Sequence, residues 1–160
     1  IHNLASTAPL ERSFFSTAKQ YLDGFTRSCN IGTQLTVDPQ LDDRTFTPAM
    51  QLQLFRILQE ALSNARKHGR AHQVGVSFTA DNDRMSMIVI DDGCGFDPKA
   101  VAHSDGAHYG LDFMRSRAAE LGGGLHVTSE PGCGTRVTVQ IPVNASSPPE
   151  RGDHHESASG

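Results

Sequence analysis

Residues 47–69 read TPAMQLQLFRILQEALSNARKHG, and this stretch carries the clearest helix signals of the chain. Thr47 is a suitable N-cap, Pro48 is well tolerated at the first helical position, and Gly69 is typical of the residue after a helix. Between them, apolar residues recur every three or four positions, which indicates an amphipathic helix. The stretch therefore predicts a long helix from Pro48 to about His68 that lays one face on a core.

Polar and apolar residues separate onto different faces of this helix. At about 100° per residue, Glu60, Asn64 and Lys67 fall on one stripe. The positions roughly opposite are apolar: Leu54, Leu58, Ala61 and Ala65. Amide and carboxylate oxygens suit Mg²⁺, which keeps several waters and takes few protein ligands beside substrate phosphates. The stripe is a candidate metal and phosphate site, although such spacing alone more often marks a solvated helix face.

The segments before this helix predict one more helix and one strand. Residues 10–29 carry apolar side chains at three- and four-residue steps, so a helix is expected to begin near Pro9 and to end at about Cys29. Residues 33–37 (TQLTV) alternate and are β-branched, which indicates a strand. A loop is expected at residues 42–44.

The segments after the long helix predict two hairpins. Alternating residues 74–79 and 85–90 form the first, and a polar loop without a period of its own then runs to His108. A short helix is expected at residues 110–121. The second hairpin is expected at residues 125–128 and 135–141.

This order of elements predicts an α+β fold: a two-layer sandwich with a mixed, mostly antiparallel sheet and helices on one face. The 160 residues are enough for one domain, expected at residues 1–143. Residues 144–160 are Ser, Pro, His and charged residues with almost no apolar side chain, and we expect a disordered tail.

Composition excludes several functional classes. A formal net charge of −4 gives no bias toward nucleic acid. No apolar run is long enough to span a membrane and no leader is recognisable, so this segment is expected to be cytoplasmic. Cys29, Cys94 and Cys133 form no CxxC pair, which favours reduced thiols over a disulfide framework or a zinc site.

A glycine turn follows the strand expected at residues 85–90. Residues 90–96 read IDDGCGF, and glycines at alternate positions let a backbone turn sharply and approach a ligand. The Asp91 carboxylate at the strand end can accept hydrogen bonds from an amine such as adenine N6. An ordinary Asp-Gly turn leaving an edge strand explains the same residues without a ligand.

Two further motifs are weaker individually. Gly110 is expected at the N-terminus of the short helix, where unpaired N–H groups can hold a phosphate and the preceding loop can close as a lid. A glycine helix cap is the simpler interpretation. The turn at residues 132–135 (GCGT) carries Thr135, which can face the same site or merely lead into a β-branched strand.

Together and in this order, the motifs resemble the GHKL ATPase superfamily over about residues 10–142. They match its N box (Glu60, Asn64, Lys67, His68), its G1 box (Asp91, Gly93, Gly95), its G2 box (Gly110, Leu111) and its terminal turn (Gly132, Gly134, Thr135). The stretches EALSNARKHG, DDGCGF and HYGLDFMRSRAAELGG are similar to the sensor histidine kinases related to the nitrate/nitrite sensors.

The resemblance implies roles for individual residues. Asn64 would be a direct Mg²⁺ ligand and Glu60 would hold a water of the metal's shell, and these two are the implied catalytic residues. Asp91 would accept from the adenine amino group, with Thr135 supporting that contact through water. The remaining implied ATP-binding residues are Lys67, His68, Gly93, Gly95, Phe96, His108, Tyr109, Gly110, Leu111 and Gly134.

The resemblance also implies a reaction and partners. The γ-phosphoryl group of Mg-ATP would pass to a histidine on dimerisation helices of a parent kinase, and then to an aspartate of a response regulator. None of the eight histidines here fits such an acceptor helix, so we expect a monomer with little autophosphorylation. ATP or ADP, the acceptor helices and the regulator are the implied partners. Nucleic acid and membrane contact by this segment are not implied, although the parent kinase can be membrane-anchored.

Two departures from the superfamily pattern keep alternatives open. Asp92 stands where many relatives have Asn, which adds negative charge near the nucleotide, and His108 replaces the first glycine of the G2 box, which would stiffen the lid. An anti-sigma-factor type serine kinase of the same superfamily is one alternative. An ATP-binding interaction module without chemistry is the other.

Overall fold

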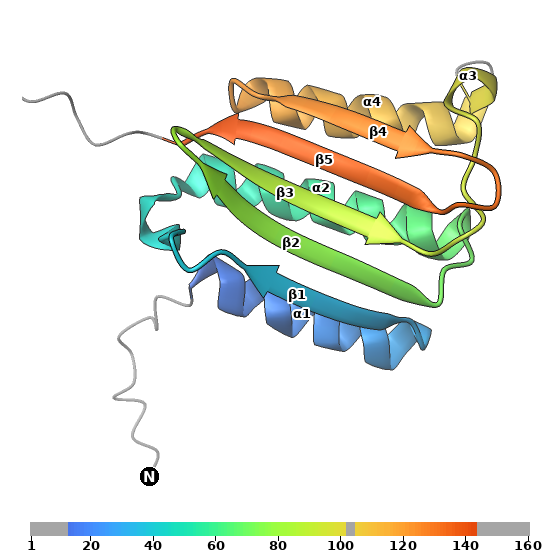
Figure 1. Cartoon of the computed structure of the whole chain (residues 1–160), viewed down its shortest axis with the longest axis horizontal. Coiled ribbons are helices and arrows are strands. Elements are labelled where there is room, and N and C mark those ends of the chain that lie inside the picture. The colour runs from blue at the N-terminus through green and yellow to red at the C-terminus, as the bar shows by residue number, and fades with distance from the viewer. Residues whose placement is uncertain (1–12, 102–104, 144–160) are drawn as a thin grey trace, which may run out of the picture.

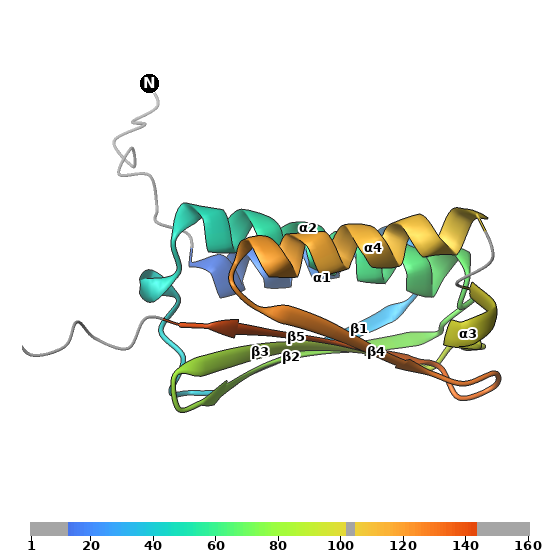
Figure 2. The ribbon, with the colours of Figure 1, turned by 90° about the horizontal axis from the view of Figure 1, so that it is seen from above.

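A computed structural model describes residues 13–101 and 105–143, and it has the expected two-layer α+β architecture. Figures 1 and 2 show one sheet with its three long helices on a single face. The strands are β1 (Gly32–Val37), β2 (Gln73–Asp81), β3 (Arg84–Asp91), β4 (Gly124–Ser129) and β5 (Thr135–Pro142). The helices are α1 (Phe14–Cys29), α2 (Pro48–Lys67), α3 (Pro98–Val101) and α4 (Asp105–Glu120), with a 3₁₀ turn, η1 (Asp43–Thr45), in the expected loop.

The sheet is mixed, as predicted, with the strand order β1-β2-β3-β5-β4. Only β1 and β2 are parallel, because α2 carries the chain from the end of one back to the start of the other. The other three pairs are antiparallel. Antiparallel pairing of β3 with β5 sets Asp91, the last residue of β3, opposite Thr135, the first residue of β5. Two residues that are far apart in sequence therefore meet at one end of the sheet.

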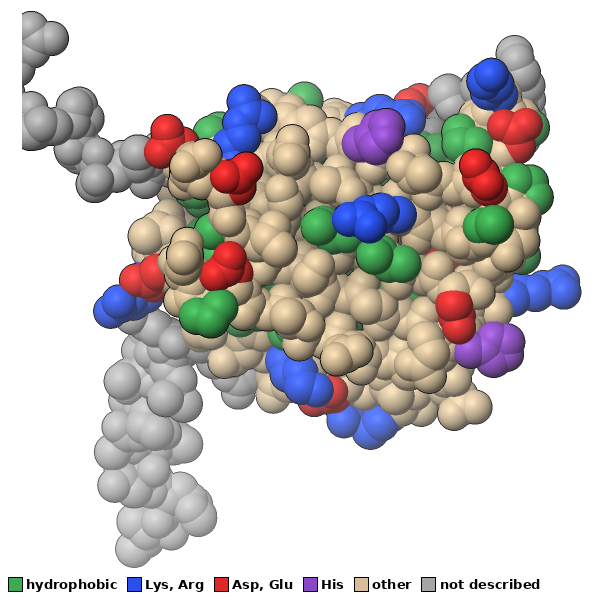
Figure 3. Space-filling model, in the orientation of Figure 1, with side chains coloured by type: hydrophobic (Ala, Val, Ile, Leu, Met, Phe, Trp, Pro, Cys, Tyr) green, Lys and Arg blue, Asp and Glu red, His purple; other side chains and the backbone are tan. Residues whose placement is uncertain are grey.

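The core lies between the sheet and α2. Inward positions of β3 and β5 alternate with outward ones, and the inward residues are buried: Met85, Met87, Val89, Val137, Val139 and Ile141. The buried face of α2 covers them with Leu54, Ile57, Leu58, Ala61, Leu62 and Ala65. The opposite sheet face carries mainly backbone and uncharged polar side chains, as Figure 3 shows, which lets an antiparallel sheet face water on one side. Within the described residues, no helix is sufficiently long and apolar to cross a membrane.

Helix α1 begins at Phe14, so the expected start near Pro9 is wrong. The Ser13 hydroxyl accepts a hydrogen bond from the Ser16 N–H at 3.1 Å and ends the helix there as an N-cap. Apolar periodicity continued past this cap to Leu10 in the sequence and therefore misplaced the boundary. Phe14 is buried and packs edge-to-face on Phe46 and Phe78, which fixes α1 to the sheet.

Helix α4 begins at Asp105, five residues before the expected start at Gly110, so the polar loop expected up to His108 is shorter than predicted. The short helix α3 also lies within that stretch. The apolar periodicity that predicted this helix begins only at Leu111. Leu111 is the first residue of α4 described as buried in the core, followed by Met114 and Ala118. The expected tail at residues 144–160 lies outside the described residues, so the domain boundary stays a prediction.

Two leucines on α2 offer a matched test of the core. Leu54 is 0% exposed and Leu52 is 49% exposed. Leu54→Ala is expected to lower the free energy of unfolding by about 2–5 kcal/mol, because it leaves a cavity under α2. Leu52→Ala should change it by less than about 0.5 kcal/mol. Urea denaturation followed by circular dichroism measures both, and similar losses from the two variants would contradict the packing described.

Candidate functional site

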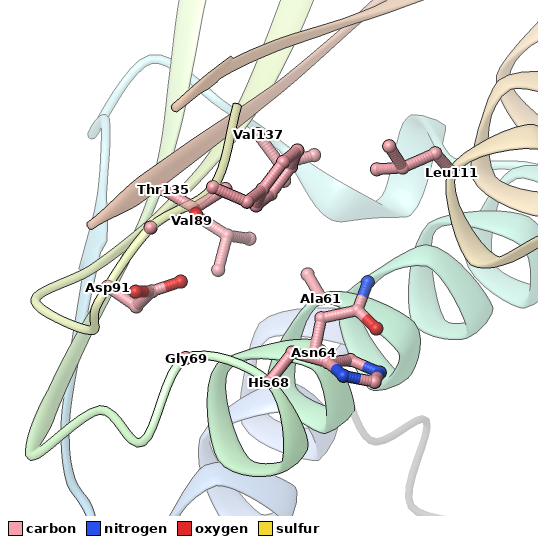
Figure 4. A pocket seen from close by; sticks show the side chains of 11 residues that line it. Ala61, Asn64, His68, Gly69, Val89, Asp91, Leu111, Thr135 and Val137 are labelled. Carbon is pink, nitrogen blue, oxygen red and sulfur yellow. The ribbon is translucent and has the colours of Figure 1, made fainter. Parts of the chain in front are cut away.

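A cavity of about 230 Å³ lies between α2, α4 and the end of the sheet where β3 stops and β5 begins. Figure 4 shows side chains of α2 facing side chains of the sheet across it, with Leu111 of α4 beside them. Its walls are Ala61, Asn64, His68, Gly69, Val89, Asp91, Gly95, Phe96, Leu111, Thr135 and Val137. The lining therefore combines aliphatic and aromatic side chains with polar ones. Such a lining suits a flat, largely apolar ring that carries polar substituents.

Asp91 is the buried acid of this cavity, with 8% of its surface exposed. One carboxylate oxygen accepts a hydrogen bond from the Gly93 N–H at 2.8 Å. Burial raises the pKa of Asp91 above its ordinary value, and the backbone N–H groups of Gly93 and Thr135 offset only part of this rise. The negative charge of the neighbouring Asp92 adds to it. A buried carboxylate with incomplete compensation is suited to accept hydrogen bonds from a ligand.

Two glycines with positive φ let the turns beside Asp91 pack closely. Gly134 has φ 73°, and a Cβ there would collide with the backbone carbonyl oxygen of Asp91. Gly95 has φ 61°, and a Cβ would collide with the carbonyl oxygen of Glu130. Any other residue would force the turn after β3 away from the β4–β5 turn. These positions explain two of the glycines singled out in the sequence.

The opposite wall is formed by α2. Asn64 lines the cavity, and Glu60 lies one turn earlier on the same helix. Gly110 of α4 sits over both: a Cβ at Gly110 would lie 2.5 Å from Glu60 Oε1 and 3.7 Å from Asn64 Nδ2. Glycine therefore lets α4 approach the polar stripe of α2. Of the stripe predicted from sequence, Glu60 and Asn64 face α4, and Asn64 also lines the cavity.

Seven of the predicted site residues line the cavity: Asn64, His68, Asp91, Gly95, Phe96, Leu111 and Thr135. Gly93, Gly110 and Gly134 support its edges through the close contacts above, and Lys67 is exposed outside the wall. The side chains of His108 and Tyr109 lie outside the described residues. One expectation is wrong in its geometry: Gly110 is inside α4 and does not open it, so its N–H is not a free helix-terminal donor.

Asp92 does not place its charge on the cavity wall. One carboxylate oxygen accepts from the N–H groups of His72 and Gln73 at 2.8 and 2.9 Å, at the start of β2. These backbone hydrogen bonds, that of Gln73 first, lower the pKa of Asp92. The acid that departs from the superfamily pattern therefore has a structural role in joining the end of β3 to the start of β2.

Several site residues were not singled out from the sequence. Val89 and Val137 line the cavity as inward residues of β3 and β5, and strand alternation was the available signal. Gly69 lines it as well, and its carbonyl accepts from the Cys94 N–H at 2.7 Å. Ser129, the last residue of β4, is buried at 7% exposure. It is hydrogen-bonded to Phe96 in the turn after β3 and to Gly134 in the turn before β5. No local pattern marks such a serine, because its partners come from other segments.

The fold is a two-layer α+β sandwich with a cavity at one end of its sheet. Residues 49–145 match the family described as histidine kinase-, DNA gyrase B-, and HSP90-like ATPase, and the chain belongs to this family. The resemblance inferred from the sequence motifs is thereby confirmed.

The curated relatives include sensor histidine kinases. The chain is 35% identical over 125 residues to the sensor histidine kinase LiaS of Bacillus subtilis, covering 78% of this chain and 33% of LiaS. It is 33% identical over 129 residues to the nitrate/nitrite sensor protein NarX of Escherichia coli, covering 81% of this chain and 21% of NarX. The chain thus spans a third or less of these relatives. The serine-kinase and interaction-module alternatives are not favoured by these relatives.

Solved structures agree on the fold. The histidine kinase domain of the Erythrobacter litoralis EL346 blue-light activated kinase superposes with a TM-score of 0.62 at 20% identity, covering 82% of this chain and 61% of that one. Full-length ShkA in complex with AMPPNP superposes with a TM-score of 0.64 at 24% identity, covering 90% of this chain and 32% of ShkA. These similarities establish the architecture of a histidine kinase ATPase domain.

Asp91 and Asp92 are expected to affect stability in opposite directions. The raised pKa of Asp91 means that the folded state loses stability as pH rises from the ordinary value of 3.8 through the folded pKa. Asp91→Asn should therefore increase the free energy of unfolding at neutral pH. The lowered pKa of Asp92 contributes stability that is present above 3.8 and lost as pH falls through the folded pKa.

Asp92→Asn should accordingly decrease the free energy of unfolding at neutral pH, and it serves as the matched neighbour. Urea denaturation without nucleotide, repeated from about pH 4 to pH 8, measures both variants. Shifts of the same sign at neutral pH would contradict the environments assigned to the two carboxylates.

Proposed function

We propose that this chain binds Mg-ATP in the cavity and supplies the catalytic half of a sensor histidine kinase. It transfers the γ-phosphoryl group to a histidine on separate dimerisation helices, for relay to a response-regulator aspartate. One observation carries the proposal: Asp91 on the sheet and Asn64 on α2 face each other across one cavity with apolar walls. This arrangement suits a ligand with a flat base at one end and phosphates at the other.

The base occupies the apolar middle of the cavity. Val89, Val137 and Leu111 provide aliphatic surface, and Phe96 adds an aromatic ring. The buried Asp91 carboxylate accepts a hydrogen bond from the adenine amino group, because its pKa is raised by burial and its hydrogen bonding is incomplete. Thr135, opposite Asp91 in the sheet register, supports this contact.

The phosphates and Mg²⁺ lie against the polar stripe of α2. Asn64 offers an amide oxygen directly and Glu60 offers a carboxylate to a water of the metal's shell, a donor set that fits Mg²⁺. Glu60 Oε1 and the Asn64 amide both lie close to Gly110 of α4, which supports a shared position for the two side chains. When bound, Mg²⁺ neutralises charge on the phosphate oxygens.

Lys67 and His68, at the C-terminal end of α2, are proposed to contact the phosphates. His68 lines the cavity and Lys67 precedes it. Gly110 and Leu111 place α4 against the nucleotide, and His108 and Tyr109 directly precede them in the chain. Gly93, Gly95 and Gly134 keep the turns close to the base.

Transfer depends on positioning and charge neutralisation, because phosphoryl transfer needs little covalent chemistry from the protein. Glu60 and Asn64 would hold the metal that binds the phosphates, and the nucleophile would be the imidazole of a separate chain segment. The sensor histidine kinase relatives support this assignment. Since ATP and response regulators are cytoplasmic, the domain is proposed to act there, including within a membrane-anchored parent.

Asn64→Ala tests the metal role. The variant should remain folded, because Asn64 is only partly buried, and should lose at least about tenfold in Mg-dependent ATP affinity with one metal ligand removed. Gln59→Ala is the matched control: Gln59 is an amide of the same helix on its α1 side. Calorimetry with ATP, with and without Mg²⁺, measures both. Full Mg-ATP affinity in folded Asn64→Ala would remove Asn64 as a ligand.

Phosphoryl transfer is tested in trans. The chain is mixed with the acceptor helices of the parent kinase and labelled ATP, and acid-labile phosphate is expected on histidine of the helices. Asn64→Ala is expected to abolish this label. Label on a serine, or ATP binding without any transfer, would contradict the kinase assignment while leaving the nucleotide site intact.

A further inference from the structure

Ser129 forms a hydrogen-bonded junction behind the cavity. Its hydroxyl oxygen lies 2.9 Å from each of three partners: the Phe96 N–H, the Gly134 carbonyl oxygen and the Thr135 hydroxyl. Ser129 itself is buried and is not part of the cavity wall, whereas Phe96 and Thr135 line it. Ser129 therefore acts on the cavity through its neighbours.

The proton positions at this junction follow from counting donors. A serine hydroxyl has one proton to donate and two lone pairs to accept with. The Phe96 N–H can only donate and the Gly134 carbonyl can only accept, so the Ser129 proton goes to Gly134. Ser129 then has one lone pair left for the third contact. That contact is attractive only if the Thr135 hydroxyl donates to Ser129.

This direction determines what Thr135 offers to a ligand. With its single proton committed to Ser129, the Thr135 oxygen presents only lone pairs toward the cavity. Asp91, beside it across the β3–β5 pair, also accepts only when ionised. If one water lies between Thr135 and the ligand, it donates one proton to Thr135, and it presents only lone pairs to the ligand when its second proton goes to the Asp91 carboxylate.

We propose that Ser129 is a positioning residue for base specificity: it fixes the Thr135 proton so that the cavity favours a purine with an amino group at C6 over one with a carbonyl there. The inference rests on the proposed nucleotide-binding function and deepens it. Adenine has a donor at C6, whereas hypoxanthine and guanine have an acceptor that would face the oxygens of Thr135 and Asp91. Without Ser129, the Thr135 hydroxyl is free to rotate and donate to that carbonyl.

The test compares ATP with inosine triphosphate, which replaces the C6 amino group by a carbonyl. Calorimetry in the presence of Mg²⁺ gives the ratio of the two affinities for the wild-type chain, Ser129→Ala, Thr135→Val and the double variant. Ser129→Ala is expected to reduce the preference for ATP roughly tenfold, which corresponds to one misdirected hydrogen bond. In the Thr135→Val background, Ser129→Ala should not change the ratio further.

A merely structural role for Ser129 would weaken ATP and inosine triphosphate equally, and an unchanged ratio in folded Ser129→Ala overturns the inference. If Ser129→Ala does not fold, the affinities of Thr135→Val for ATP and inosine triphosphate test the inference instead. Selective loss of ATP affinity supports an acceptor-only Thr135, and equal loss of both nucleotides overturns it. Failure of the wild-type chain to bind ATP at all would refute the proposed function instead, so the two failures are distinguishable.

Discussion

The close backbone contact between the end of β3 and the turn before β5 is the constraint on which the site depends. Antiparallel pairing sets Asp91 opposite Thr135, and Gly134 packs directly on the Asp91 carbonyl because it has no Cβ. The pairing aligns an acid with a hydroxyl at one end of the sheet. Side chains of α2 and α4 form the other sides of the cavity. Without this contact, the ends of β3 and β5 would not come together to complete it.

Helix α2 links the stability of the domain to its function. Its apolar face covers the sheet and includes fully buried Leu54, while the stripe with Glu60 and Asn64 turns toward α4. Ala61 lies on the boundary, since it is buried in the core and also lines the cavity. A shift of the helix that optimised one face would displace the other, so core packing holds the polar stripe in position.

Two adjacent acids show how local environment separates function from structure. Asp91 is held in a position where burial disfavours its charge, and such an unfavourable environment is common where a ligand supplies the missing partner. Asp92 accepts two backbone hydrogen bonds at the start of β2, and these stabilise its ionised form. Ser129 has a structural role of the same kind as Asp92. All of its hydrogen bonds are made within the protein, and through them it leaves Thr135 with only lone pairs toward the cavity.

Local sequence patterns were sufficient to predict the elements whose signals come from neighbouring residues. Thr47 and Pro48 specified the start of α2, alternating residues specified the hairpins, and the motif set specified the family, because caps, periods and turns depend on neighbouring residues. The folded structure was needed to find the early start of α4, the direction of the Asp92 carboxylate and the junction at Ser129. Ser129 and Phe96 are 33 residues apart, and contacts of that kind exist only after β3, β4 and β5 have assembled.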